Sequence, residues 1–364
     1  MGISRQSLYR MVDSLISLCK ELLILINERN SFFKEAKRHF TDMHLKKGSY
    51  HDYKKSFWKH RVTYSEYMYS YEFWRLSEKE RDKYISTSEM QCLYRKLTDK
   101  SVRHIFCNKI EFLKTFDKYI YRKWGWVRDM TIQEFQSMIC ECDCIAKPIR
   151  GTRGNGIFKI VSSRVENWRA LYKKCVDDNI LLEHCIHEFD ELSSFHPSSL
   201  NTIRIVTISN NDKVVVFGAL FRMGAHGSFI DNTHAGGVYA PINLCTGTID
   251  VSAIDSHNNK YETHPDTGKK IVGFKIPYWK EIIETCKEAT QTIPNVRFVG
   301  WDVCVNQEGK VEIIEGNYAP DFDGGMQAPL KIGVKQKIAD TIQSVYGINP
   351  LPFIKVCNFP RQIS

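Results

Sequence analysis

Residues 298–317 read FVGWDVCVNQEGKVEIIEGN, and the other motifs of the chain can be interpreted around them. Two runs rich in apolar and β-branched residues, 298–305 and 311–314, enclose a polar segment in which Gly309 can adopt a positive φ. This pattern predicts a β-hairpin with a short turn.

Three polar residues of this hairpin can meet on one face. Symmetric folding about Glu308 and Gly309 pairs Asp302 with Glu315, and Asn317 follows two residues later on the same face. Two paired carboxylates repel each other unless a cation lies between them. Oxygen ligands suit Mg²⁺, or Mn²⁺, rather than zinc. We therefore predict that Asp302, Glu315 and Asn317 bind a metal ion, with a solvent-facing hairpin as the alternative.

A second informative stretch, AKPIRGTRGNG, occupies residues 146–156. Lys147 ends a predicted strand, and Gly151, Gly154 and Gly156 follow it. Glycines let backbone N–H groups approach phosphate oxygens, and the lysine supplies positive charge. The glycine order matches neither a P-loop nor the dinucleotide fingerprint. We predict a phosphate-binding loop, with a surface hairpin loop as the alternative.

The composition is that of a globular protein with two or three domains. The chain has 364 residues, of which 43% are hydrophobic and 26% charged. No secretory signal is expected, and the N-terminal apolar stretch is too short and too charged to span a bilayer, although an amphipathic surface helix remains open. The twelve cysteines lack a framework spacing, which predicts a reducing, cytoplasmic location.

Positive charge is concentrated in the N-terminal third. Residues 1–105 hold 21 Lys and Arg against 13 Asp and Glu, a net charge of +8, whereas the remainder holds 30 against 29, a net charge of +1. Aromatic residues crowd positions 64–74, which predicts a helical region with inward-facing aromatic side chains. An anionic partner or peripheral membrane contact is the less favoured alternative, and nucleic acid is not expected because the remainder is nearly neutral.

Helices and strands are predicted without a strict alternation, which indicates an α+β fold. Capping boxes are predicted at Ser77 with Glu80 and at Thr131 with Glu134. Besides the hairpin, the predicted strands span residues 142–147, 180–186, 202–209 and 214–221. The predicted helices span residues 1–40, 105–121, 131–138, 168–176, 278–291 and 331–346.

The motifs at Lys147-Pro148, 182–186 and 202–204, followed by the predicted metal ligands, together resemble the ATP-grasp superfamily. Over roughly residues 75–345 the chain is most similar to the sugar-transfer-associated ATP-grasp family. That likeness is carried by PSSLNTIR at 197–204, FRMG at 221–224, DN at 231–232, GG at 236–237, HP at 264–265, IPYW at 276–279 and GWD at 300–302.

The resemblance implies an ATP-grasp fold, in which ATP lies between two α+β lobes, here preceded by a helical N-terminal region. The implied divisions are a basic, aromatic-rich helical region over 1–105, lobe 1 with the phosphate loop and adenine linker over 106–190, lobe 2 with the metal and phosphate site over 191–350, and a C-terminal tail over 351–364.

The resemblance also implies a role for individual residues. Phosphate contacts are expected from Lys109, Lys147, Gly151, Gly154 and Gly156. Adenine recognition is expected from the Glu183 strand through the His184 carbonyl and the Ile186 N–H group, and ribose binding from Asp190. Transfer of the phosphoryl group is expected to involve Arg204, Arg222 and Asn232, with Gly236 and Gly237 on the loop facing the triphosphate and the acceptor.

Ordinary structural or surface roles remain open as alternatives for several of these residues. Lys109 can be an ordinary surface lysine, and Arg204 and Arg222 can form structural ion pairs, because each lies on an apolar strand. Many ATP-grasp ligases begin with a Rossmann-like domain that helps to bind the carboxylate substrate. Residues 1–105 do not have that pattern, so the substrate pocket is not carried over from the family, and the oligomeric state is also left open.

The resemblance implies an enzyme that uses ATP and Mg²⁺. The expected reaction is that of an ADP-forming carboxylate–amine ligase, in which a carboxylate becomes an acyl phosphate that an amine captures. The implied context is surface-glycan or cell-envelope polysaccharide biosynthesis, with a small-molecule carboxylate and an amine or sugar-linked acceptor as partners. The alternatives are an ATP-grasp kinase acting on a hydroxyl of a sugar or other small molecule, and a non-enzymatic adaptor.

Overall fold

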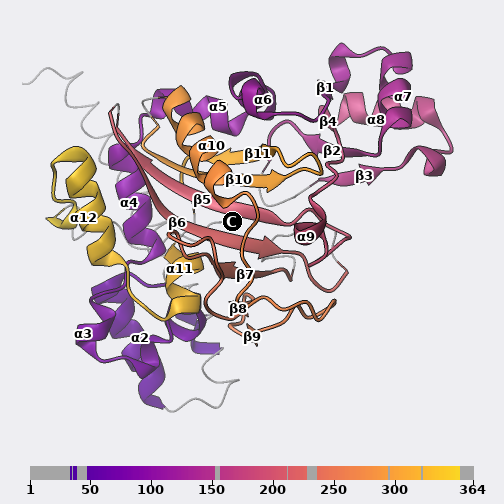
Figure 1. Ribbon diagram of the computed structural model, residues 1–364. Helices are drawn as coiled ribbons and strands as arrows, with labels where there is room; N and C mark the ends of the chain where they lie inside the picture. The colour runs from indigo at the N-terminus through magenta and orange to yellow at the C-terminus, as the bar shows by residue number, and fades with distance from the viewer. Residues whose placement is uncertain are drawn as a thin grey trace, which may run out of the picture.

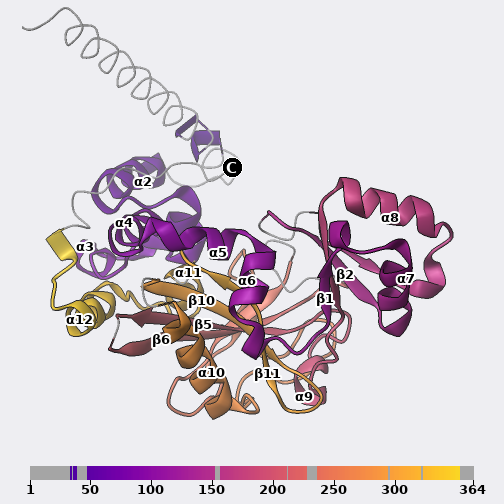
Figure 2. The ribbon, with the colours of Figure 1, turned by 90° about the horizontal axis from the view of Figure 1, so that it is seen from above.

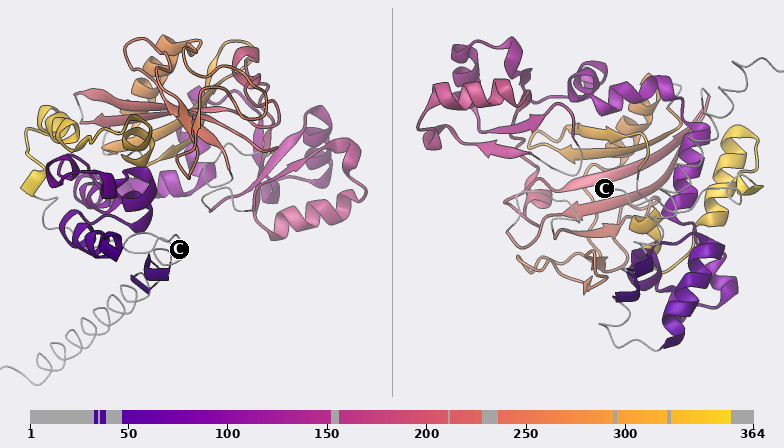
Figure 3. Two further views of the ribbon diagram at one scale, coloured as in Figure 1. Left: turned by 90° about the horizontal axis from the view of Figure 1, so that it is seen from below. Right: turned by 180° about the vertical axis from the view of Figure 1, so that it is seen from behind.

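The computed structural model describes residues 33–34, 36–38, 47–151, 156–210, 212–227, 236–293, 296–320 and 323–352. These residues form a four-stranded sheet and a seven-stranded sheet, each with its own helices, together with a helical region that lies against the larger sheet (Figure 1). The smaller lobe projects from one side of the large sheet, and the N-terminal helices α2 to α4 lie on the other side (Figure 3).

The small sheet has the antiparallel order β1-β4-β2-β3. Its strands are β1 (Trp124–Trp126), β2 (Cys144–Pro148), β3 (Phe158–Ile160) and β4 (Ile180–His184). Helices α7 (Ile132–Glu141) and α8 (Trp168–Asp177) share one apolar core with these strands, through side chains such as Phe135 and Cys175. The predicted capping box of Thr131 and Glu134 is present at the start of α7.

The large sheet is antiparallel throughout and has the order β11-β10-β5-β6-β7-β8-β9. Its strands are β5 (Thr202–Ser209), β6 (Val214–Met223), β7 (Val238–Pro241), β8 (Ala253–Ile254), β9 (Lys260–Tyr261), β10 (Phe298–Val305) and β11 (Val311–Asn317). The prediction of β5 is confirmed at both ends, and β6 and β11 extend beyond the predicted strands.

Helices cover both faces of the large sheet, which is why its central strands β5 and β10 are buried along their whole length. On one face, Ile203 and Ile205 belong to the same core as α10 (Trp279–Thr292). On the other face, Val206 and Ile208 belong to the core of the three helices seen opposite α10 in Figure 2. These are α4 (Thr87–Leu97), α11 (Asp323–Leu330) and α12 (Lys335–Tyr346).

The helical N-terminal region comprises α2 (Lys47–His60), α3 (Glu78–Arg81) and α4, and it is followed at its predicted border by α5 (Arg103–Cys107) and α6 (Lys109–Thr115). The prediction that its aromatic side chains point inward is confirmed for a buried cluster that includes Tyr53, Tyr67 and Phe73. Trp58 and Trp74 are exceptions and remain exposed. The region is therefore a packed unit with a core of its own.

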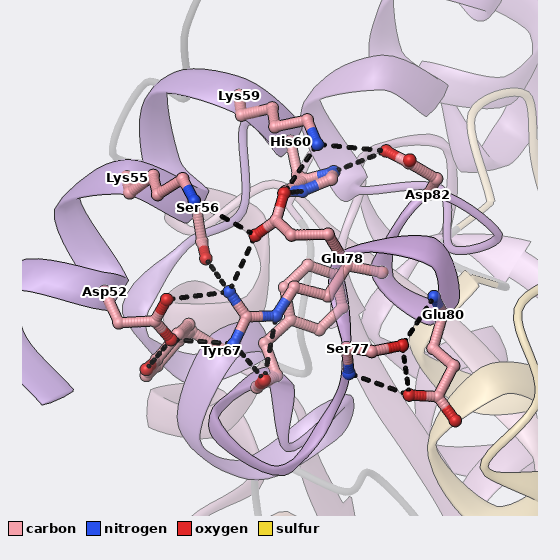
Figure 4. Close-up of polar contacts among 12 residues, drawn as sticks. Asp52, Lys55, Ser56, Lys59, His60, Tyr67, Ser77, Glu78, Glu80 and Asp82 are labelled. Carbon is pink, nitrogen blue, oxygen red and sulfur yellow. Dashed lines mark hydrogen bonds and ion pairs between the residues drawn. The ribbon is translucent and has the colours of Figure 1, made fainter.

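A buried arginine, Arg81, joins α2 to α3 inside this region. Its partners Asp52, Ser56 and Glu78 are labelled in Figure 4. The guanidinium group of Arg81 donates to both carboxylate oxygens of Asp52, at 2.8 and 2.7 Å, and to the Ser56 hydroxyl at 3.0 Å. Above it, Glu78 lies 2.5 Å from Lys59 and 3.8 Å from Lys55. Part of the positive charge of this basic region is therefore neutralised by its own carboxylates.

Polar contacts fix the N-terminal region on the large sheet. The backbone of Ile85 exchanges hydrogen bonds of 3.1 and 2.9 Å with the buried side chain of Gln327 on α11. Lys335 of α12 forms an ion pair of 2.9 Å with Glu89 of α4. Since α4 also contributes apolar side chains to the core of the sheet, this region covers apolar surface of lobe 2.

The helix predicted over residues 105–121 is wrong as one element. It is interrupted at Asn108, whose backbone is extended, with φ −116° and ψ 110°, and whose side-chain oxygen caps the N–H groups of Ile110 and Glu111. Lys109 is therefore the first residue of α6. The predicted helix at the N-terminus falls mainly on residues 1–32, which lie outside the described part of the chain, as do tail residues 353–364.

Two findings bear on the expected location. No helix within the described residues is long and apolar enough to cross a membrane. Nine cysteines of the described residues are free thiols, whereas Cys92 is disulfide-bonded. A reducing, cytoplasmic location therefore stays a prediction, as do the domain boundaries.

Candidate active site

The β10–β11 hairpin pairs Asp302 with Glu315, as the sequence predicts. The inner pairs, such as Val305 with Val311, are offset by one residue from the symmetric count. A β-bulge between Asp302 and Val303 restores the register, so the predicted pairing is right although the count omits the bulge. Gly309 has φ 76° and forms the turn, as expected.

Asp302 is buried and is held by two arginines from neighbouring strands. Arg204 on β5 donates to both of its oxygens, with Nη2 2.7 Å from Oδ2 and Nε bonded to Oδ1, and Nη1 of Arg222 on β6 lies 3.2 Å from each oxygen. Burial alone would raise the pKa of Asp302, but Arg204 and then Arg222 outweigh it and lower the pKa to about 2. A metal ion bound by Asp302 would therefore share this carboxylate with two guanidinium groups.

Gly300 provides the space in which Arg204 reaches Asp302. A Cβ atom at position 300 would lie 2.5 Å from the Cβ of Pro320 and 3.3 Å from Nη1 of Arg204. Any other residue would have to displace the arginine or the stiff proline. Packing alone thus explains why the first residue of the GWD motif is glycine, whether or not a ligand binds nearby.

Glu315 carries the less compensated charge of the hairpin. Its side chain is exposed, yet desolvation of the carboxyl group by the surrounding protein, followed by the charge of Asp302, raises the pKa of Glu315. The amide nitrogen of Asn317 lies 3.4 Å from Oε1 of Glu315. Glu315 and Asn317 present hard oxygen donors, which fit Mg²⁺ completed by phosphate and water. Among the described residues, no group of three or more His, Cys, Asp and Glu side chains could hold a metal by itself.

The predicted phosphate-side lysines lie on the small lobe and at its border. Nζ of Lys147 on β2 lies 2.7 Å from Oε2 of Glu183 on β4, which is buried. Nζ of Lys109 donates to the Pro148 and Gly151 carbonyls at 3.0 and 3.3 Å. Burial lowers the pKa of Lys109, against the attraction of Glu315, which is therefore near enough to interact. The structure thus brings Lys109, Lys147 and Glu183 to the side of the hairpin that carries Glu315.

The glycine-rich loop is described only at its two ends. Gly151 has φ 148° and Gly156 has φ 74°, both in the region that favours glycine. Gly154 lies outside the described residues. The loop therefore begins and ends with backbone conformations that require glycine, and its phosphate contacts stay a prediction.

The residues expected to bind the nucleoside follow one another after β4. The His184 backbone N–H donates to the Lys123 carbonyl at 2.9 Å, and its ring Nε2 lies 3.0 Å from the Met138 carbonyl. Ile186 lies in the connection that follows, and Asp190 is the exposed first residue of α9 (Asp190–Ser193). Their contacts with adenine and ribose stay predictions.

The loop after β6 is anchored by residues of the family motifs. His264 Nε2 lies 2.7 Å from the Gly224 carbonyl, and the His196 ring and the Ser199 hydroxyl occupy the place that a side chain at Gly224 would need. Gly236 has φ 93°, and Gly237 is buried beside it at the start of β7. Asn232 lies outside the described residues, so its catalytic role stays a prediction.

Sequence reasoning missed two residues at the border of the lobes. Arg122, between η4 (Asp117–Tyr119) and β1, contacts Glu183 of the small sheet and Glu312 of β11. Neither residue belongs to a motif or a regular pattern, and the partners of Arg122 are 61 and 190 positions away in the chain. Only the three-dimensional arrangement identifies this contact.

The sequence over both lobes matches a known protein family. A family model described as sugar-transfer-associated ATP-grasp matches residues 79–341. The chain belongs to the sugar-transfer-associated ATP-grasp family. Its two α+β lobes and the helical region before them are an ATP-grasp fold with an N-terminal addition.

Solved structures include ATP-grasp ligases with low sequence identity. The ligase PsnB, solved with a minimal precursor, Mg and ADP, has a TM-score of 0.43 and 12% identity over 69% of this chain and 62% of that one. The D-Ala:D-Ser ligase VanG of Enterococcus faecalis has a TM-score of 0.40 and 12% identity over 64% and 59%. N5-carboxyaminoimidazole ribonucleotide synthetase of Thermotoga maritima has a TM-score of 0.37 and 11% identity over 69% and 57%.

The chain thus spans less than two thirds of the length of each of these proteins. We draw nothing about function from likenesses at this level. A search of curated proteins found no match.

Asp302→Asn is expected to destabilise the protein by about 3–5 kcal/mol, because it leaves buried guanidinium charge without its carboxylate. Urea denaturation at neutral pH measures this difference. The pKa of Asp302 is depressed in the folded state, so the advantage of the wild type is present above the ordinary carboxyl range and is lost as the pH falls through about 2. Asp250→Asn, an exposed substitution in the same lobe, is the control. An equal loss of unfolding free energy in both variants would show that the ion pairs of Asp302 with Arg204 and Arg222 do not stabilise the fold.

Glu315→Gln is expected to leave the metal-free protein as stable as the wild type or more stable by up to about 1 kcal/mol, because it removes repulsion with Asp302. The raised pKa means that folded Glu315 keeps a proton that the unfolded chain has lost, so wild-type stability falls as the pH rises through that window. The gain in Glu315→Gln therefore grows with pH. Thermal melts with and without Mg²⁺ and nucleotide measure both effects.

The same variant should lose activity and Mg²⁺-dependent stabilisation, because the amide keeps the shape and loses the charge that attracts the cation. Normal turnover by Glu315→Gln would show that the metal assignment is wrong.

Proposed function

We propose that this chain is an ATP- and Mg²⁺-dependent ligase that activates a carboxylate as an acyl phosphate and transfers the acyl group to an amine. Membership of an ATP-grasp family supports this proposal. The single observation that carries it is the set of charged side chains at the border of the two lobes. Lys147 of the small sheet bonds Glu183, and Lys109 at the start of α6 bonds the Pro148 and Gly151 carbonyls, whereas Asp302 and Glu315 pair in the large sheet. Cations for phosphate oxygens and carboxylates for a divalent ion are the two requirements of phosphoryl transfer.

In the proposed reaction, a carboxylate oxygen of the substrate attacks the γ-phosphorus of ATP, and the bond to the β,γ-bridging oxygen breaks to release ADP. The amine nitrogen then attacks the acyl carbon, the carbon–oxygen bond to phosphate breaks, and the amine loses a proton. Lys109 and Lys147 would hold phosphate oxygens. Arg222, which is only half-buried beside Asp302, would stabilise charge on the transferring group.

Glu315 and Asn317 would hold Mg²⁺ directly, with Asp302 completing the set where it can share its oxygens with the arginines. The ion would neutralise charge on the phosphates. Glu315 would have to be ionised, so Mg²⁺ affinity is expected to fall as the pH drops through its raised pKa.

The proposed context is a surface-glycan or cell-envelope pathway in the cytoplasm, with a small-molecule carboxylate and an amine or sugar-linked acceptor. The family description, which refers to sugar transfer, supports a sugar-linked partner. A kinase acting on a hydroxyl is the rival outcome of the activity test.

ATP with Mg²⁺ is expected to raise the melting temperature, because a ligand at one hundred times its dissociation constant adds about 2.7 kcal/mol of stability. Differential scanning fluorimetry with ATP, with Mg²⁺ and with both measures the shift. No shift at millimolar concentrations, with the protein shown to be folded, would rule out the nucleotide assignment.

The chemistry is tested by an ADP-release screen over pairs of amino acids and nucleotide sugars with ATP and Mg²⁺. A ligase should release ADP and free phosphate only when both co-substrates are present. Formation of ADP with one hydroxyl substrate, and of a phosphorylated product without free phosphate, would replace the ligase with a kinase.

Charge reversal at Lys54 and Lys55 is expected to raise the KM of an anionic acceptor and to leave the KM of ATP unchanged, because excess positive charge lies in the N-terminal region. Reversal at Lys173 and Lys174, another adjacent pair of exposed lysines on a helix, is the matched control. The KM values of the acceptor and of ATP, measured at two salt concentrations, test this electrostatic role.

An acceptor KM that is unchanged and independent of salt would leave the N-terminal region as a structural cap. A cap predicts instead that deletion of residues 1–75 makes the protein insoluble, because it removes every buried member of the aromatic cluster except Tyr84 and leaves that side chain uncovered.

A further inference from the structure

A buried arginine, Arg122, contacts both sheets and so links the two lobes. Arg122 lies between η4 (Asp117–Tyr119) and β1, and it is 8% exposed. Its Nε atom donates to Oε2 of Glu183 on β4 at 2.9 Å, and its Nη1 atom donates to Oε1 of Glu312 on β11 at 2.8 Å. One planar guanidinium group thus binds a carboxylate from each lobe.

Arg122 also holds the backbone of the strand that carries the predicted metal ligands. Nη1 donates to the carbonyl of Ile313 at 2.9 Å, and Nη2 donates to the carbonyl of Ile314 at 3.3 Å. Its own backbone N–H donates to Oε1 of Glu312 at 2.9 Å. The next residue is Glu315, so the hydrogen bonds from Arg122 to β11 end one residue before this predicted metal ligand.

On the other side, the contact continues into the predicted phosphate site. Oε2 of Glu183, which accepts from Arg122, also accepts from Nζ of Lys147 at 2.7 Å. Arg122 and Lys147 balance Glu183 and Glu312, so the buried set has no net charge. An unbroken series of contacts therefore runs from Lys147 through Glu183 and Arg122 to the backbone beside Glu315.

We infer that Arg122 is a positioning residue that sets the metal-binding strand at a fixed place relative to the nucleotide-binding lobe. This inference rests on the proposed function. A lysine cannot replace it, because a single ammonium group does not reproduce the planar fork that serves two carboxylates and two carbonyls at once. The role differs from that of a scaffold ion pair, because it couples the two halves of a site: nucleotide phosphates on one lobe and Mg²⁺ on the other.

The test compares wild type, Arg122→Lys and Glu312→Gln for the binding of ADP and of ADP with Mg²⁺, by calorimetry and thermal shift. Lys123→Gln is the matched control, since it removes the neighbouring cation, which forms an exposed pair with Glu141. Glu312→Gln keeps the shape of its side chain and loses only the charge on the lobe 2 side. It therefore keeps the test decisive if Arg122→Lys does not fold.

Binding of ADP alone should stay close to that of the wild type in both variants, because Lys147 and Glu183 still contact each other. The gain in affinity that Mg²⁺ gives should fall by about tenfold, the lower end of the effect of residues that support metal ligands. With substrates, kcat should fall while the KM of ATP changes little. Lys123→Gln should match the wild type throughout.

Folded variants with the wild-type gain from Mg²⁺ would overturn the inference. Equal loss of ADP binding with and without Mg²⁺ would also overturn it, because the arginine would then only maintain the fold of the lobe. Failure of the proposed function gives a different result, in which the wild type itself binds neither ADP nor ADP with Mg²⁺.

Discussion

A buried carboxylate is costly unless cations compensate it, and the active-site region is organised by two such groups. Asp302 takes Arg204 and Arg222 from adjacent strands, whereas Glu183 takes Lys147 and Arg122. In both cases burial alone would raise the pKa of the carboxyl group, and the cations outweigh it. These pairings fix side chains that lie up to 98 positions apart in the chain. These two carboxylates are therefore compensated by protein cations before a ligand arrives.

This compensation indicates which carboxylate of the candidate site remains available to a ligand. Asp302 and Glu183 form ion pairs with protein cations, whereas Glu315 is exposed, has a raised pKa and contacts the amide group of Asn317. A carboxylate whose ionisation is opposed by its neighbour gains most from a divalent cation. Of the pair, Asp302 is thus held by two arginines whereas Glu315 is the better candidate for binding a cation, although the sequence presents them as equivalent.

Sequence patterns predicted what depends on local periodicity and pairing. The β5 and β10 boundaries, two capping boxes and the opposition of Asp302 and Glu315 follow from neighbouring residues. The bulge beside Val303 could not be predicted, because the residues beside it do not differ from ordinary strand residues. The break at Asn108 was missed because its extended backbone interrupts an otherwise helical pattern. The role of Arg122 could not be predicted, because its partners lie on strands that are far away in the sequence.

The helices α4, α5 and α6 pack beside the candidate metal site in a way that the charge of the N-terminal third does not suggest. Phe106 of α5 and Phe112 of α6 pack where a side chain at Gly316 would lie, between the two predicted ligands Glu315 and Asn317. Four residues further on, the hydroxyl group of Tyr94 donates to the Pro320 carbonyl. The chain is therefore held on both sides of Asn317, by α5 and α6 at Gly316 and by α4 at Pro320. A region that packs in this way limits the movement of the predicted metal ligands, so its stability and the geometry of the proposed metal site cannot vary independently.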